Sequence, residues 1–260
     1  MLLFKILCTP LLIWASVLAT RRWGAFVGGC VAGLPSISGP ISFCIAIEQG
    51  PAFAAVVAHN ALLGVWVVCI FTLAYAWTAV RHKWHTALIT AIMAYFVSGW
   101  AMGFVPHIPA LAVAAGVSGP LATIVLLPAV PPDTKTNIHS RARWSLPAQM
   151  VFGVLLVVTI TGTATLLGPH WSGVLTFYPV GVTILAPFCH FTLGVSATMK
   201  LIAGIMSGFM GGISFMIVVF FGVELLPLAL CYALATAVTI VVCILVAKVQ
   251  KAIHTTNSSD

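Results

Sequence analysis

The chain has 260 residues, of which 61% are hydrophobic and 6% are charged, and its formal net charge is +7. Soluble domains carry about 25% charged residues, so the composition excludes a soluble globular protein and predicts an all-α polytopic membrane protein. The basic residues form no face with interleaved aromatic side chains, so we expect no nucleic acid among the partners.

About nine segments are apolar and long enough to cross a bilayer, which takes about 20 residues. They are the ranges 2–20, 24–47, 52–79, 86–104, 108–130, 147–167, 171–191, 194–222 and 225–247. The first segment leads into Arg21 and Arg22 instead of a small-residue cleavage site, so we expect a retained span and not a cleaved signal peptide. The longest polar stretch, residues 131–145, divides five spans from four.

The charges between the spans predict their orientation. Nine of the eleven basic residues lie in connections that would share one side of the membrane, and only Lys5 and Lys200 lie within spans. Because cytoplasmic loops are enriched in Lys and Arg, we expect the N-terminus outside and the C-terminus in the cytoplasm. Two short re-entrant loops in place of two spans would reproduce part of this pattern, and that alternative stays open.

A shift of 144 positions aligns residues of the two halves of the chain without a gap. The aligned pairs include Gly24 with Gly168, Gly29 with Gly173, Pro35 with Pro179, Gly50 with Gly194, Gly64 with Gly208, and Phe71 with Phe215. Five spans separate the starts of the two copies, so the copies would enter the membrane from opposite sides, as in inverted-repeat transporters. We therefore expect a 4+1+4 inverted-topology repeat with broken helices 2 and 7. Its parts are residues 1–104 (first repeat), 105–145 (connector span and cytoplasmic linker), 146–250 (second repeat) and 251–260 (cytoplasmic tail).

The second span contains the stretch Gly-Leu-Pro-Ser-Ile-Ser-Gly-Pro at residues 33–40. It cannot continue a regular helix, because each proline removes a backbone donor and each glycine weakens the helix. Lipid offers no partner for free backbone groups, so such a break must be buried in protein or line a cavity. The alignment gives it a counterpart at Pro179. Transporters bind substrate between such breaks; the alternative is a proline kink whose glycines let neighbouring helices approach.

The candidate substrate-binding residues come from the two breaks and from one charged residue of the eighth span. They are Gly33, Pro35, Ser36, Ser38, Gly39, Pro40, Pro179, Gly181 and Lys200. Lys200 would supply a positive charge for an anionic substrate; alternatively, its side chain snorkels to the cytoplasmic surface. The candidates for proton or ion coupling are Glu48, His59, Asn60 and His190. Glu48 could equally be an interfacial residue, and His59 could hydrogen-bond between packed helices.

Motifs of hydrolases, metalloproteases and P-loop enzymes are missing from the sequence. We therefore expect no enzyme and no catalytic residue. The seven cysteines are scattered through apolar segments, and Cys189 and His190 lack convincing further ligands. Neither a metal nor another cofactor is expected.

Two runs of residues carry a resemblance to a known group. The first comprises Arg22-Trp23-Gly24, Gly28-Gly29, Gly33-Leu34-Pro35, Ser38-Gly39-Pro40 and residues 48–55, Glu-Gln-Gly-Pro-Ala-Phe-Ala-Ala. The second comprises Leu167-Gly168-Pro169, Ser172-Gly173, Pro179, Phe188-Cys189-His190 and Gly194. Together they resemble an uncharacterised family of small bacterial inner-membrane proteins. The resemblance implies a bacterial origin and a location in the cell inner membrane, and it transfers no function. With the orientation expected from the loop charges, the N-terminus of this multi-pass protein would be periplasmic.

The sequence favours a secondary transporter or exporter of a small solute, bound at the midplane between the interrupted helices. The shortage of intramembrane acids argues against a polyvalent cation and mildly favours a small anion or an amphipathic compound. Two alternatives stay open: a non-transporting scaffold or accessory subunit, and a channel. The expected partners are the lipid bilayer and a small-molecule solute, with further copies of the chain in a homo-oligomer as an open alternative.

Overall fold

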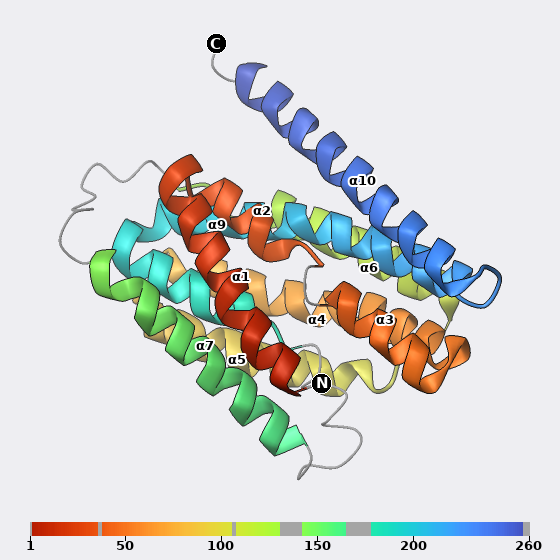
Figure 1. Cartoon of the computed structure of the whole chain (residues 1–260). Helices are drawn as coiled ribbons and strands as arrows, with labels where there is room; N and C mark the ends of the chain where they lie inside the picture. Colours follow the sequence, from red (N-terminus) through yellow and green to blue (C-terminus); the bar gives the residue numbers. More distant parts are fainter. Residues whose placement is uncertain (1, 36–37, 106–107, 131–141, 165–177, 257–260) are drawn as a thin grey trace.

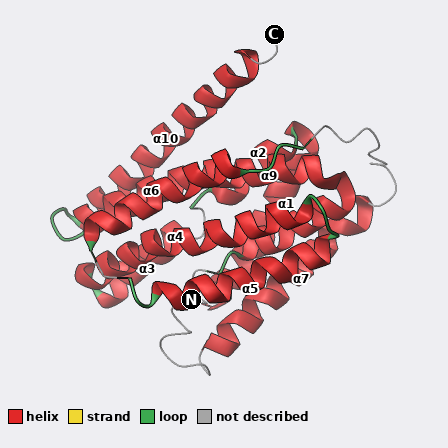
Figure 2. Cartoon of the chain, turned by 180° about the vertical axis from the view of Figure 1, so that it is seen from behind, coloured by secondary structure: helices red, strands yellow, loops and turns green. Residues whose placement is uncertain are grey.

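A computed structural model describes residues 2–35, 38–105, 108–130, 142–164 and 178–256. Over these residues the chain is helical and contains no strand (Figures 1 and 2). The helices are α1 (Leu2–Trp23), α2 (Ala25–Gly33), α3 (Ser38–Gln49), α4 (Pro51–Ala79), α5 (Trp84–Met102), α6 (Pro109–Leu126), α7 (Ala142–Ala164), α9 (Val180–Gly222) and α10 (Leu228–Thr256). The all-helical prediction is confirmed.

Five of the described helices are long and apolar enough to cross a membrane. They are α4, α5, α6, α9 and residues 228–246 of α10. Their outward faces carry large apolar side chains, such as those of Val97, Val125 and Ile240. Exposing such faces to water is unfavourable, whereas contact with the acyl chains of lipids is favourable. The structure therefore suggests a multi-pass membrane protein.

Glycines with positive φ mark three sharp corners in the chain. Gly24 (φ 95°, ψ 164°) separates α1 from α2, and Gly50 (φ 90°, ψ 165°) separates α3 from α4. Gly194 (φ 85°, ψ 179°) interrupts α9. Residues with a side chain rarely adopt this backbone conformation. Gly194 divides α9 into an N-terminal arm, residues 180–193, and a C-terminal arm, residues 195–222.

The C-terminal arm of α9 lies at the centre of the bundle. It packs closely against α2, because a side chain at Gly29 would collide with the backbone at Leu201 and Gly204. Further along, Gly33 lies against Gly208 in the same way. Figure 1 shows α2 and α3 leading in succession from one end of the bundle to the other, and α4 returning. The helices α2 and α3 thus run in the same direction, one after the other, and α3 does not turn back along α2.

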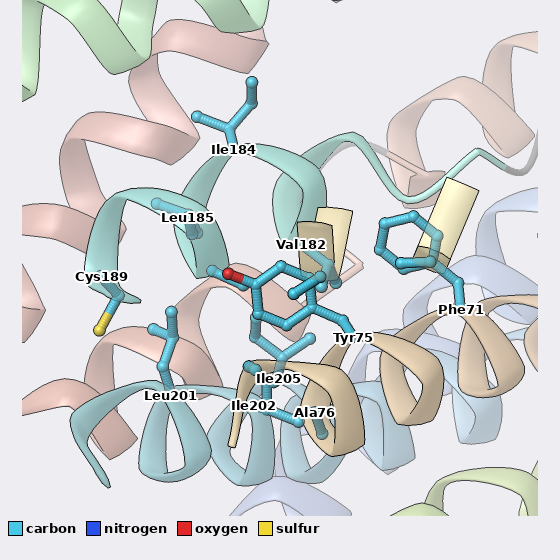
Figure 3. Packing of buried hydrophobic residues seen from close by; sticks show 14 of the residues in the cluster. Phe71, Tyr75, Ala76, Val182, Ile184, Leu185, Cys189, Leu201, Ile202 and Ile205 are labelled. Atoms are coloured by element: carbon cyan, nitrogen blue, oxygen red, sulfur yellow. The ribbon is translucent and has the colours of Figure 1, made fainter. Parts of the chain in front are cut away.

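Two hydrophobic clusters fill the bundle. One includes the N-terminal arm of α9, and the other includes α3. The first joins the N-terminal arm of α9 to α4 and α5, and the second joins α3 to α4, the far part of α9 and α10. Figure 3 shows the first cluster, where Tyr75 of α4 lies between Leu185 of the N-terminal arm and Ile202 of the C-terminal arm. The N-terminal arm of α9 is therefore largely buried, whereas α3 buries one face with Ser42 and Ala46 and exposes Cys44 and Ile47 on the other.

Basic and acidic side chains that the structure describes lie at opposite ends of the bundle. Gly29 packs beside Leu201, so the corner at Gly24 and the basic end of α1 lie toward Gly194. The described Lys and Arg side chains are all exposed and lie toward this end; they are Arg21, Arg22, Arg81, Lys83, Lys200 and Lys248. Glu48 and Glu224, the acids that the structure describes, follow the direction of α3 and of the C-terminal arm to the other end.

Candidate functional site

The first interruption lies between α2 and α3. Gly33 is buried, and a side chain there would collide with the backbone of Ile205 and Gly208. Gly208 stands at the middle of the C-terminal arm of α9, so α2 ends near the middle of the bundle. Pro35 is half-buried and lies beside Gly212. Small residues allow this close approach of backbones in membrane helices.

The beginning of α3 continues along the same arm. Gly39 is buried beside the ring of Phe215, whereas Pro40 is exposed. Ser42 is buried and shares a hydrogen bond of 2.8 Å with the Tyr232 hydroxyl of α10. Of the two serines predicted to bind substrate, Ser36 lies outside the described residues. Ser38 begins α3, and its side chain also lies outside the described part.

The second interruption precedes the N-terminal arm of α9. Pro179 is buried with φ −78° and ψ 66°, and its carbonyl accepts a hydrogen bond of 2.9 Å from the Thr183 N–H. The Val180 N–H donates to the Tyr178 carbonyl at 2.8 Å. Gly181 is half-buried, and no described atom lies within 4 Å of the position that a side chain there would take. This turn is therefore more open, among the described residues, than the region around Gly33.

Three aromatic rings stand beside this turn; we refer to Phe71, Tyr95 and Tyr178 as the aromatic triad. The ring centroids of Tyr95 and Tyr178 are 5.0 Å apart, those of Phe71 and Tyr178 are 6.1 Å apart, and those of Phe71 and Tyr95 are 6.2 Å apart. All three pairs meet edge to face, which is a favourable arrangement of aromatic quadrupoles. Phe71 and Tyr95 are fully buried. The triad fixes Tyr178 directly before Pro179.

Thr183 differs from the other threonines of the core. Its side chain is 8% exposed, and its hydroxyl makes no hydrogen bond with a described atom. The Tyr178 hydroxyl is its near neighbour, but the pair does not reach hydrogen-bond geometry. Several buried threonines donate to the carbonyl four residues earlier; they are Thr72, Thr123, Thr198 and Thr239. An unsatisfied buried hydroxyl costs about 1–3 kcal/mol.

Lys200 lies far from the first interruption. It is exposed and lies six residues after Gly194, toward the basic end of the bundle. Gly212, which contacts Pro35, is twelve residues further along the arm, a separation of about 18 Å at 1.5 Å per residue. This position favours the alternative in which the Lys200 side chain reaches the membrane surface.

The predicted coupling residues occupy three different places. Glu48 is exposed near the end of α3. His59 is buried in α4 with its Nδ1 atom 3.5 Å from the Asn60 Oδ1 atom, and its ring lies 5.5 Å from that of Phe220. His190 of the N-terminal arm of α9 lies with its Nδ1 atom 3.3 Å from the hydroxyl of Tyr75, which is fully buried. His190 therefore makes a polar contact with a different helix.

Sequence reasoning did not identify Tyr75, Tyr95, Tyr178 and Thr183 as members of a site. Tyr178 could have been noted because it directly precedes Pro179, but no pattern distinguishes Thr183 from other threonines. The corner role of Gly50 and Gly194 was also missed, although the alignment pairs them. Within the described part of the chain, no cluster of three or more His, Cys, Asp or Glu residues could hold a metal ion.

Comparisons with protein-family models, with curated proteins and with solved structures give no match to this chain.

Proposed function

We propose that the protein is a secondary transporter or exporter of a small solute, which binds near the midplane between two interrupted helices. The observation that carries the proposal is the pair of short helices, α3 and the N-terminal arm of α9, which run to opposite ends of the bundle. Each follows an interruption that contains a buried or half-buried proline. Transporters use such discontinuous helices at their binding sites.

The helix lengths indicate that α3 and the N-terminal arm of α9 both begin near the middle of the bundle. The N-terminal arm of α9 has 14 residues (180–193) and the C-terminal arm has 28 (195–222), so their lengths are about 21 and 42 Å. Because the two arms meet at Gly194, the shorter one begins about halfway along the longer one. The 12 residues of α3 make about 18 Å, and α3 begins beyond the middle of the longer arm. Both N-termini, with their partial positive charge, thus face the interior, which favours an anionic solute.

Element boundaries support the inverted repeat that this proposal requires. Adding 144 to the bounds of α3, α4 and α5 gives 182–193, 195–223 and 228–246. These ranges correspond to the two arms of α9 and to the apolar part of α10, residues 228–246. The helix α6 would then be the connector between the repeats.

Contacts between the halves support the same relation. Phe71 of the first half packs against Tyr178, at the start of the N-terminal arm of α9. Its aligned residue Phe215, in the second half, packs against Gly39, at the start of α3. The aligned glycines Gly50 and Gly194 also share one backbone conformation. A two-fold relation between the halves would produce this exchange of contacts.

Coupling to protons, if transport is coupled, would use the Tyr75–His190 pair before the other candidates. Histidine changes its charge near neutral pH, and this pair links α4 of the first half to the N-terminal arm of α9 in the second. A charge change there would alter the contact between two elements that move relative to each other in a rocking mechanism. Glu48, exposed near the end of its helix, has no such position.

Solute flux into proteoliposomes tests the proposal. Labelled anions, cations and neutral solutes would be compared for the wild type, for Pro35→Ala with Gly39→Ala, and for Pro147→Ala. The last change removes an exposed proline of α7 away from both interruptions and serves as the matched control. We expect flux of one solute class in the wild type and in the control, and a reduced flux in the double variant.

Two results would contradict the transporter. Absence of flux for every solute class would favour a scaffold or accessory subunit. Flux that responds to the gradient of the solute alone, and never to a proton or ion gradient, would favour a channel. The orientation is tested separately by labelling His82→Cys and Glu224→Cys, two exposed positions, in intact cells. We expect only the second cysteine to react from outside; equal labelling of both would contradict the proposed topology.

A further inference from the structure

Thr183 and Gly181 give the second interruption two properties that the described residues of the first do not show. The Thr183 hydroxyl is more than nine-tenths buried and makes no hydrogen bond with a described atom. It belongs to the start of the N-terminal arm of α9, where the Val180 N–H donates to the Tyr178 carbonyl and the Thr183 N–H donates to the Pro179 carbonyl. Beside it, Gly181 faces space that no described atom occupies within 4 Å of a side-chain position. An unsatisfied buried donor beside a glycine that no described atom approaches within 4 Å is a suitable place for an acceptor from a ligand.

The charge of that acceptor follows from its surroundings. The start of a helix carries about half a positive elementary charge, which favours an anion over a cation. All described Lys and Arg side chains are exposed, whereas Thr183 is buried. The described part of the site can therefore compensate the single negative charge of a monoanion. A dianion such as sulfate would keep much of its charge uncompensated in an apolar environment, at a high cost in free energy.

The aromatic triad identifies the remainder of the ligand. Tyr178 places its hydroxyl beside that of Thr183, and its ring packs edge to face against Tyr95 and Phe71. Such rings bury apolar surface well. The hydroxyls of Tyr178 and Thr183 are both able to donate, one to each oxygen of a carboxylate.

We propose that the first turn of the N-terminal arm of α9, with Tyr178 and Thr183, binds the carboxylate of a small organic monoanion whose apolar part rests against the aromatic triad. This assignment rests on the proposed function, because it names the class of solute that the transporter would carry. Thr183 and Tyr178 donate hydrogen bonds to the carboxylate, and the helix start supplies the electrostatic attraction.

Ligand binding to purified protein in nanodiscs tests the site independently of flux. The probe is benzoate at neutral pH, where it is ionised. Benzyl alcohol keeps the ring without the charge, benzylamine reverses the charge, and sulfate doubles it without a ring. Affinities would be measured by calorimetry for the wild type, Thr183→Val, Thr183→Ser, Tyr178→Phe and Thr123→Val. The last variant removes a buried hydroxyl that already bonds within α6, and serves as the matched control.

We expect benzoate to bind the wild type more tightly than any of the other three probes. Thr183→Val and Tyr178→Phe should each weaken benzoate about tenfold, the effect of losing one hydrogen bond to a charged group. Thr183→Ser, which keeps the hydroxyl, and Thr123→Val should bind within about threefold of the wild type. Should Thr183→Val fail to fold, the contrast between Tyr178→Phe and Thr183→Ser decides the question.

The possible failures are distinguishable. Equal benzoate affinity in the wild type, Thr183→Val and Tyr178→Phe would overturn the site and leave transport untouched. Tighter binding of benzylamine or sulfate than of benzoate would overturn the solute class. Benzoate binding that depends on Thr183 while flux is absent for every solute would keep the site and contradict the transporter.

Discussion

The two interruptions differ in how the protein packs around them. At the first, Gly29 and Gly33 of α2 touch the backbone of the C-terminal arm of α9 so closely that a side chain could not fit. At the second, Gly181 faces space that no described atom fills, and Thr183 holds an unsatisfied hydroxyl. The first interruption is a close-packed contact between two helices, and the second is where we propose that the solute binds.

This difference assigns separate tasks to breaks that look alike in the sequence. A close backbone contact gains dispersion energy and tolerates no added volume. A binding site must instead keep polar groups available, and it loses stability in the absence of its ligand. Substitutions of glycine at the two interruptions should therefore have opposite consequences for stability and for binding.

The largest expected effect is that of Gly208→Val in the contact between α2 and α9. Its side chain would collide with the backbone of Cys30 and Gly33, and neither backbone can move without separating the helices. We expect a loss of about 3 kcal/mol or of the folded protein altogether, measured by thermal unfolding and size exclusion in detergent. The control is Gly162→Val in α7, where no described atom lies within 4 Å. Equal behaviour of the two variants would contradict the close-packed contact.

Glycine corners come next in magnitude. Gly50→Ala and Gly194→Ala each place a side chain on a backbone with φ near 90°, at a cost of about 1–3 kcal/mol. Because the alignment pairs these glycines, we expect similar losses in the same unfolding assay. Gly162→Ala should instead be neutral or stabilising, since alanine favours helix. A loss at only one of the two corners would weaken the case for a repeat.

A smaller effect is expected for Tyr75→Phe, which removes the hydroxyl that faces His190. Membrane hydrogen bonds of this kind contribute about 0.6 kcal/mol, so the protein should fold normally. If the pair couples transport to protons, flux in Tyr75→Phe should lose its response to a pH gradient. Tyr232→Phe removes the hydroxyl that bonds Ser42 at 2.8 Å and serves as the matched control. An unchanged pH response in Tyr75→Phe would exclude the pair from coupling.

The smallest effect on stability is expected for Gly181→Ala. The added methyl group meets no described atom within 4 Å, and alanine favours the helix that begins there. We expect the unfolding temperature to stay constant or to rise slightly, while benzoate affinity falls because the methyl group occupies ligand space. An unchanged affinity would place the ligand elsewhere.

Much of this comparison could be anticipated from the sequence. Residues 33–40 contain enough prolines and glycines to predict the first break, and composition alone predicts an all-helical membrane chain. The predicted gap between residues 191 and 194 coincides with the corner at Gly194. These features are local, because they depend on which residues a helix tolerates.

The tasks of the two breaks could not be predicted, because they depend on contacts between distant residues. Gly33 is a packing residue only because Gly208 lies opposite. Thr183 is notable only because its hydroxyl makes no hydrogen bond within its own helix. The Thr72 hydroxyl, in contrast, donates to a carbonyl of its own helix. Lys200 was predicted to bind an anionic substrate because it lies within an apolar span, yet it is exposed toward the basic end of the bundle. Helix pairing decides each of these cases, and residue type alone does not encode it.

Thiol accessibility at Gly181 tests the central claim most directly, since it requires no knowledge of the solute. A cysteine would be placed at Gly181 in a background without the native cysteines and exposed to a membrane-impermeant thiol reagent, which needs water to react. Leu155→Cys, on an exposed apolar face of α7, is the lipid-facing control, and His82→Cys is the aqueous control. We predict that the cysteine at Gly181 reacts and that benzoate slows its reaction at a concentration raised to offset the weaker binding to this variant. A cysteine there that stays as unreactive as Leu155→Cys from both sides of the membrane, while His82→Cys reacts, would contradict a solute site at this interruption.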